Sequence, residues 1–211
     1  MAAFLANIGA NASHRVRSPR HPDGTYAVWP IPETVPWAPP MRRLPQVWGG
    51  RAVHQDPDFD SAVPTYGDNC RTAGRAFALR RARSGDLIVF LARLHDADGR
   101  AGFHLVASLE IGAVLADVAA DPGPGWWDGN AHVLRGRATG AWNQFWVFRG
   151  TLRSRRFPYS RALDRGLAGA LLPDISWPPT RTELQVIGSH TRAVRRLTGA
   201  AEAHLRSLCP S

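Results

Sequence analysis

The sequence SGDLIVFLARLHDADGRAGFHLVASLEIGAVL, residues 84–115, predicts the hairpin on which the fold is built. Residues 87–94 and 103–114 are rich in β-branched and large apolar side chains, and the polar segment DADG at 96–99 separates them. This composition is typical of two strands joined by a tight turn. Gly85 precedes the first strand and fits a sharp turn, because glycine adopts positive φ without steric cost.

Residues 13–50 are crowded with proline. Each proline lacks an amide donor and restricts the residue before it, which excludes a long helix or a central strand. The segment nevertheless keeps Trp29, Ile31, Trp37 and Trp48, which a solvated linker rarely does. We expect an ordered proline-rich arm that wraps over the rest of the domain.

Residues 69–150 are expected to form a central helix and sheet. A helix over 69–83, with a modest apolar face, leads into the hairpin. A further strand pair is expected around 131–135 and 144–148. The segment between the two strand pairs, DPGPGWWDGN at 121–130, predicts a turn-rich loop that carries two tryptophans.

The closing segment, residues 189–208, predicts a helix because apolar side chains recur at helical spacing and Ser189 can serve as its N-cap. Together the elements favour a single α+β domain over residues 1–211, with a mixed or barrel-like sheet. No apolar run reaches the roughly 20 residues needed to cross a bilayer. Cys70 and Cys209 stand far apart without a ligand pattern, as in reduced cytosolic proteins. We therefore expect a cytoplasmic protein with no membrane partner.

The chain has 26 basic and 17 acidic residues and a formal net charge of +9, and every basic residue is arginine. Guanidinium groups match phosphate oxygens and stack on bases, so the charge favours a nucleic acid or a nucleotide as partner. A GC-rich coding bias explains the missing lysine but not the positive excess. The candidate phosphate contacts lie in two arginine runs, Arg153, Arg155, Arg156 and Arg192, Arg195, Arg196. A solvated positive face is the alternative for both runs.

The strongest candidate for chemistry is HQDPDFD at residues 54–60. Pro57 stops a helix and extends the backbone, which favours aspartates pointing to one side. Hard cations take oxygen ligands, so Asp56 and Asp58 are candidate ligands for Mg²⁺ or Mn²⁺. The alternative is an acidic surface turn in which Asp56 or Asp58 caps the segment that follows.

Histidines and tryptophans supply the remaining candidates. A histidine beside Asp56 could act as a general base or a metal ligand, and His14 and His54 are the candidates for this role. His104 lies inside a predicted strand and is better explained as a hydrogen-bonded core residue. Trp126 and Trp127 sit in a glycine and proline loop where rings are hard to bury, which favours base stacking. Core packing better explains the aromatic residues at 145–148.

Several phrases occur in order along the first half of the chain: ANIGANASH at 6–14, SP at 18–19, PDGT at 22–25, PIPE at 30–33, HQDPDF at 54–59 and GDL at 85–87. Over residues 6–115 they resemble the nucleotide modification associated domain 3 family, which gene neighbourhoods link to bacterial and phage systems that modify DNA bases. The resemblance implies a part in nucleic-acid modification and brings no established reaction. The hairpin also resembles the PUA, ASCH and EVE class of small β-barrels, which implies a base-binding barrel.

Three hypotheses follow. In the first, the protein recognises a base or nucleotide in a DNA-modification or defence system: Trp126 and Trp127 stack the base, arginines hold phosphates, and the pocket is lined by Asn11, His14, Asp23, Asp56, Asp58 and His132. In the second, it is a metal-dependent enzyme acting on nucleotides or nucleic acid, with Asp56 and Asp58 as ligands and His14 or His54 as base. In the third, the proline-rich arm docks on a protein partner from a modification system.

Overall fold

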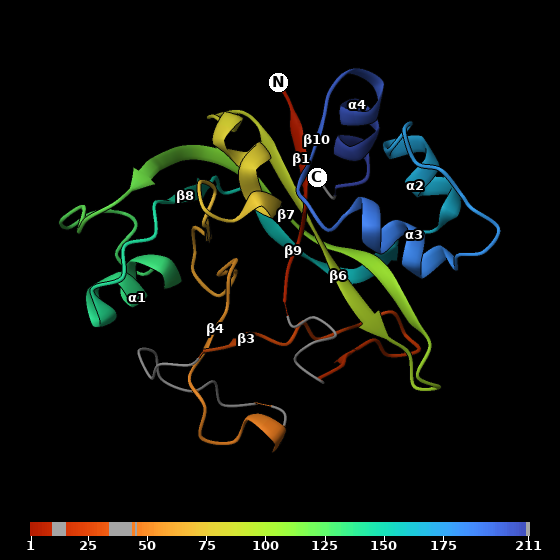
Figure 1. The fold of residues 1–211 in the computed structure, drawn as a ribbon, viewed down its shortest axis with the longest axis horizontal. Helices are drawn as coiled ribbons and strands as arrows, with labels where there is room; N and C mark the ends of the chain where they lie inside the picture. The colour runs from red at the N-terminus through yellow and green to blue at the C-terminus, as the bar shows by residue number, and fades with distance from the viewer. Residues whose placement is uncertain (10–15, 34–43, 45, 210–211) are drawn as a thin grey trace.

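The computed structural model describes residues 1–9, 16–33, 44 and 46–209. The predicted hairpin is present as β6 (Leu87–His95) and β7 (Ala101–Val118), which pair antiparallel at the centre of the sheet (Figure 1). Its turn closes when the Asp96 amide donates to the Arg100 carbonyl at 2.9 Å. Gly85 adopts a φ of +86°, as the sequence predicted for the turn into β6.

The sheet is mixed and open, and its strand order is β10-β1-β6-β7-β8-β5. β1 runs parallel to β6, and the other neighbours on this path are antiparallel. β2 also pairs with β6, and β9 pairs with β7. The remaining bounds are β1 (Ala3–Asn7), β2 (Ser18–Pro19), β5 (Thr65–Asp68), β8 (Phe145–Gly150), β9 (Arg155–Ala162) and β10 (Arg195–Leu197).

The α+β class and the mixed sheet are confirmed, but the described residues form no closed barrel. β10 and β5 end the strand order and pair with one neighbour each, so the sheet keeps two edges. The barrel-like alternative and the PUA-like barrel are therefore not confirmed by the described residues. β7 is 18 residues long. Its first part pairs with β6 and its last part pairs with β8, and this arrangement leaves the sheet open.

Each face of the sheet buries its own core, because successive side chains of a strand point to opposite faces. On one face, residues such as Leu5 and Val89 pack against α2 (Arg165–Leu171), α3 (Glu183–His190) and α4 (Gly199–Ser207). Figure 1 shows these three helices together in blue. On the other face, Phe4, Phe90 and Phe148 pack against the 3₁₀ helix η3 (Gly74–Arg81) and the loops around it. This second face carries the candidate site.

Two element predictions are wrong. Residues 131–135, expected as a strand, belong to α1 (Ala131–Thr139), which begins where the Asn130 side chain accepts a hydrogen bond from the His132 amide. Local capping therefore outweighs the apolar run that had indicated a strand.

The expected helix over 189–208 is interrupted by β10. α3 ends at His190 and α4 begins at Gly199, whose φ is +61°. Residues 195–197 add to the edge of β1 instead, where backbone pairing satisfies donors that a helix would have used internally. The expected helix over 69–83 is present only as η3, from Gly74 to Arg81.

The described residues of the proline-rich segment 13–50 contribute to a small apolar cluster in which Trp29 packs against Val16, Trp48 and Val53. The segment contains β3 (Ile31–Pro32), which pairs with β4 (Val53–His54), and the short 3₁₀ helix η2 (Gln46–Trp48). Trp37 lies outside the described residues. Both cysteines are free, and among the described residues no helix is long and apolar enough to cross a bilayer.

Candidate functional site

A polar cavity of about 390 Å³ opens on the face of the sheet opposite to α2, α3 and α4. Segments from six parts of the chain line it: the end of β1 and residues 8–9, β3 with Glu33, β4 with Asp56, β5 with Asn69, the start of η3, and α1. We call it the polar cavity. Because these segments are distant in sequence, only the assembled fold brings their side chains together.

Asp56 lies at the base of the polar cavity, with only 3% of its side chain exposed. Both of its oxygens accept a hydrogen bond from the backbone amide of Gly67, at 2.8 and 3.1 Å. Burial, reinforced by the nearby charges of Asp68 and Asp58, raises the pKa of Asp56 well above its usual value, although the hydrogen bond from Gly67 opposes the shift. This carboxyl is therefore biased toward its neutral, hydrogen-bond-donating form.

His132, on the first turn of α1, is the neighbour of Asp56. Its Nε2 lies 3.5 Å from Oδ2 of Asp56. Burial, followed by repulsion from His54 and Arg135, lowers the pKa of His132 well below its usual value. The shifts of Asp56 and His132 both favour the uncharged form of each group. Opposed shifts of this kind are frequent where a protein does proton chemistry.

His54 completes the imidazole pair. Its ring centroid lies 6.0 Å from that of His132, and its Nδ1 contacts Oε1 of Glu33. Glu33 belongs to the proline-rich arm, so the arm contributes directly to the wall of the polar cavity.

Asp68 organises the opposite wall. It is 5% exposed, and it accepts hydrogen bonds from the Tyr66 hydroxyl at 2.8 Å and from the backbone amide of Asn69 at 2.8 Å. Arg75, at the start of η3, lies 3.5 Å from it and keeps 54% of its own side chain exposed. The exposed part of the Arg75 side chain can therefore contact another group at the mouth of the polar cavity.

Several polar atoms around the polar cavity are buried and have no hydrogen-bond partner among the described residues. They are Nδ1 of His132, Oδ1 of Asn69, and Nε and Nη2 of Arg135. All three residues line the polar cavity. Leaving a buried polar group unpaired costs about 1–3 kcal/mol, so such groups rarely gather without a function.

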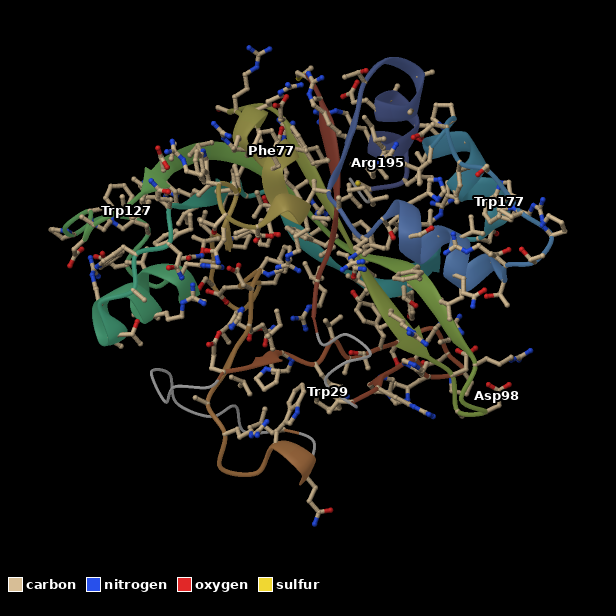
Figure 2. All side chains as sticks on the ribbon, in the orientation of Figure 1. Trp29, Phe77, Asp98, Trp127, Trp177 and Arg195 are labelled. Atoms are coloured by element: carbon tan, nitrogen blue, oxygen red, sulfur yellow. The ribbon has the colours of Figure 1, made fainter. Side chains whose placement is uncertain are left out.

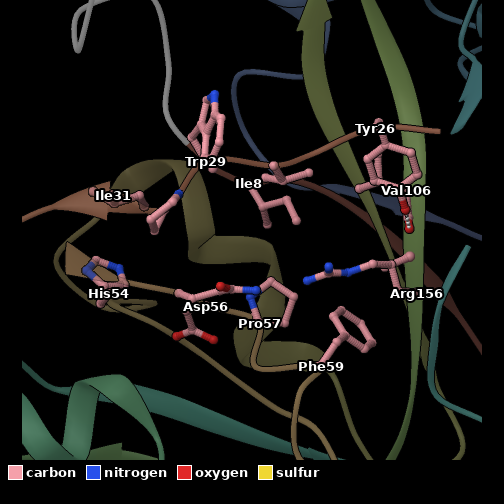
Figure 3. A pocket seen from close by; sticks show the side chains of 15 residues that line it. Ile8, Tyr26, Trp29, Ile31, His54, Asp56, Pro57, Phe59, Val106 and Arg156 are labelled. Atoms are coloured by element: carbon pink, nitrogen blue, oxygen red, sulfur yellow. Dashed lines mark hydrogen bonds between the residues drawn. The ribbon is translucent and has the colours of Figure 1, made fainter. Parts of the chain in front are cut away.

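An apolar slot of about 20 Å³ adjoins the polar cavity and shares His54 and Asp56 with it (Figure 3). Ile8, Trp29 and Phe59 form its walls, and Arg156 from β9 extends into it. Its volume is about that of one water molecule, so it can take a small substituent and not a whole ring.

The structure brings together three of the sequence-predicted residues, His54, Asp56 and His132. Asp58 lies apart from them, in an exposed turn where its carboxylate accepts from the Asp60 amide at 3.0 Å and from the Ser61 hydroxyl. Within the described part of the chain, no group of three or more histidine, cysteine, aspartate or glutamate side chains is placed to hold a metal ion. The joint metal site of Asp56 and Asp58 thus gains no support from this geometry and stays a prediction.

The other predicted ligand-binding residues lie elsewhere. Trp126 and Trp127 pack on each other and on the core beneath α1, and Trp127 donates its Nε1–H to the Gly123 carbonyl (Figure 2). Asp23 is hydrogen-bonded to Thr25 in an exposed turn. Asn11 and His14 lie outside the described residues. None of these described residues lines the polar cavity, so their stacking and base-contact roles stay predictions.

The predicted phosphate contacts are dispersed. Arg153 lies 3.6 Å from Glu110, and Arg195 is paired with Asp174 at 2.6 Å. Arg192 and Arg196 are exposed on the segment around β10, and Arg155 and Arg156 lie on β9, where Arg156 enters the apolar slot.

Sequence reasoning missed Glu33, Gly67, Asp68, Arg75 and Arg135 as members of the site. The YGDN phrase at 66–69 offered a signal, because a polar pair follows a glycine at the end of a short strand. Burial raises the pKa of the Cys70 thiol beside this phrase, which makes that cysteine a poor nucleophile.

These features define an α+β protein with a buried acid–imidazole pair and two arginines in a polar cavity beside an open mixed sheet. A model of the nucleotide modification associated domain 3 family matches residues 3–206, so the chain belongs to this family. The match is consistent with an association with nucleotide modification systems. Comparison with curated proteins and with solved structures finds no match.

Proposed function

We propose that the protein recognises a nucleotide, free or within a nucleic acid, in the polar cavity, as a component of a nucleotide modification system. The observation that carries the proposal is the set of unpaired buried polar atoms on His132, Asn69 and Arg135, which all belong to the lining of one cavity. A ligand with both donors and acceptors would satisfy them. The family supports a nucleotide as that ligand.

The size and chemistry of the polar cavity suit such a ligand. Its volume of about 390 Å³ lies within the range of about 300–1,000 Å³ found for small-molecule sites. Arg75 and Arg135 can contact phosphate or carbonyl oxygens. Asn69 and the neutral form of Asp56 offer the paired donor and acceptor groups that distinguish one base edge from another. The adjoining apolar slot can accept a small group carried by a modified base.

The test is a binding screen by isothermal titration calorimetry with nucleoside monophosphates carrying natural and modified bases. We expect at least one of them to bind, and Arg135→Gln to weaken that binding about tenfold or more, because a hydrogen bond to a charged group is worth roughly 1.5–3 kcal/mol. Arg137→Gln is the matched control, since Arg137 lies on the same helix but is paired with Asp121 and Asp128. Equal affinities for the two variants would place the ligand outside the polar cavity and reject the proposal.

A second candidate is an enzyme that hydrolyses a bond of the bound nucleotide, in which His132 accepts a proton from the attacking water and Asp56 donates a proton to the leaving group. The proximity of the two side chains and their opposed pKa shifts favour it. Incubation with the nucleotide that binds best, followed by mass spectrometry, detects a product if this is correct. A metal-dependent version requires Mg²⁺ or Mn²⁺ to raise the melting temperature, because a ligand of the native state stabilises it. It also requires Asp56→Asn to abolish that rise.

A further inference from the structure

The 3₁₀ helix η3 presents two different exposed faces. Because such a helix has three residues per turn, side chains three positions apart share a face. Ala76 and Leu79 form the buried face. The pair Phe77 and Arg80 forms a second face, and residues 75, 78 and 81 form the third. The helix begins at the mouth of the polar cavity, where Ala73 and Arg75 belong to the lining.

The face with Phe77 is a flat, exposed aromatic and cationic surface. Phe77 is 51% exposed, and the Arg80 guanidinium lies 4.8 Å from the centre of its ring. Arg80 also lies 5.8 Å from the ring of Trp146. Figure 2 shows Phe77 on the outer side of the helix. About half of Phe77 therefore faces solvent, and a nucleobase can stack on an exposed ring of this kind.

The face with residue 81 turns toward β10. The Val194 amide, just before β10, donates to the Arg75 carbonyl at 2.7 Å and ties the two elements together. Beyond that bond, a surface pocket of about 230 Å³ is lined by Arg81, Arg83 and Arg196.

The positive charge of this pocket is only partly offset by the protein. Asp86 is its only acidic lining residue, and Asp86 is 3% exposed, with its oxygens taken by the amides of Ala2 and Arg83. Within the described residues, no ion pair involves Arg81, Arg83 or Arg196, and all three are exposed. By contrast, Arg71, Arg137, Arg195 and Arg206 each have an acidic partner. Three unpaired guanidinium groups around one pocket attract phosphate oxygens.

We propose that a single-stranded segment of nucleic acid lies along η3 next to the nucleotide in the polar cavity. The phosphates of this segment contact Arg81, Arg83 and Arg196, and a neighbouring base stacks on Phe77 and Arg80. The backbone thus follows one exposed face of the helix and the bases follow the other. Stacking requires an unpaired base, which favours a single strand over a duplex. The inference rests on the proposed function and deepens it, because it identifies the ligand as a nucleic acid strand and not a free nucleotide.

The first test compares a mixed-sequence, fluorescein-labelled, ten-nucleotide single-stranded DNA with nucleoside monophosphates. In Arg81→Ala/Arg83→Ala/Arg196→Ala, we expect oligonucleotide affinity to fall about tenfold or more and the logarithmic salt dependence to lessen by about 2 between about 50 and about 200 mM salt. Binding of monophosphates in the polar cavity should not change. The control, Arg100→Ala/Arg161→Ala/Arg181→Ala, removes equal charge from other surfaces and should retain oligonucleotide binding.

The second test probes stacking. Phe77→Leu removes the aromatic face but keeps an apolar side chain, and we expect it to weaken oligonucleotide binding at least about fivefold. Phe77→Tyr should retain wild-type affinity. An equal loss in the two triple variants, or unchanged affinity in Phe77→Leu, would overturn the inference. Failure of monophosphates to bind would count against the proposed function alone, since the oligonucleotide comparison is measured separately.

Discussion

Gly67→Ala should strongly weaken nucleotide binding in the polar cavity while leaving the protein folded. A Cβ at this position would lie 2.5 Å from Cδ2 of His132 and 2.9 Å from Oδ1 of Asn130. The ring of His132 must therefore move, and the Gly67 amide that holds Asp56 moves with it. We expect binding to fall by on the order of 100-fold, because the displaced His132 and Asp56 would each lose a hydrogen bond to the ligand, worth about 1–1.5 kcal/mol. The free energy of unfolding should fall by about 1–3 kcal/mol, as overpacking usually costs.

Gly74→Ala is the control for this variant. Gly74 begins η3 beside the same cavity, and a Cβ there would meet no atom within 4 Å. Calorimetric titration and urea unfolding of both variants separate a specific steric effect from a general effect of removing glycine. In the double variant Gly67→Ala/His132→Ala, the clashing ring is gone. Its loss in free energy of unfolding should therefore be about 0.5–3 kcal/mol smaller than the sum of the losses in the two single variants. Wild-type affinity in Gly67→Ala would mean that the ligand does not contact His132 or Asp56.

The central hairpin could be predicted because its information is local. The apolar runs of β6 and β7, the DADG turn and Gly85 all act on neighbouring residues, and the structure agrees with each. The same reasoning correctly placed His54 and Asp56 near each other, since they are only two residues apart. It could not show that β1 pairs with β6 or that β5 pairs with β8, because those contacts join segments distant in sequence.

The candidate site depends on such long-range contacts. His132 meets Asp56 because α1 packs beside β5, and nothing near residue 132 indicates this. Asp68 and Arg75 are likewise brought to one cavity only by the fold. Asp58 shows a second limit of the sequence: its place in an acidic run suggested a ligand, and only the structure shows that its carboxylate accepts hydrogen bonds within the local turn. Its role as a metal ligand stays a prediction. The sequence therefore identified candidate residues from their local pattern, but it could not show which residues meet in space.

The Asp56–His132 pair makes a second, pH-dependent prediction. The pKa of Asp56 is raised in the folded protein, so the native state keeps its proton to higher pH than the unfolded chain does. Stability should therefore fall as the pH rises from the unfolded pKa of Asp, about 3.9, toward the folded value, by at most about 1.4 kcal/mol per pH unit. His132 acts in the other direction, because its lowered pKa removes stability as the pH falls below about 6.5.

Asp56→Asn isolates the contribution of Asp56, because a carboxamide has the shape of the neutral acid and can still accept from Gly67 and donate to His132. We expect the variant to gain stability over the wild type as the pH rises, until the pH passes the folded pKa of Asp56 and the difference levels off. Urea unfolding from about pH 4 to about pH 8 measures this difference. Asp98→Asn, at the hairpin tip, controls for loss of one negative charge from a cationic chain. If Asp56→Asn instead becomes less stable than the wild type as the pH rises, the carboxylate form is the one that the fold requires, and the neutral acid–imidazole pair is wrong.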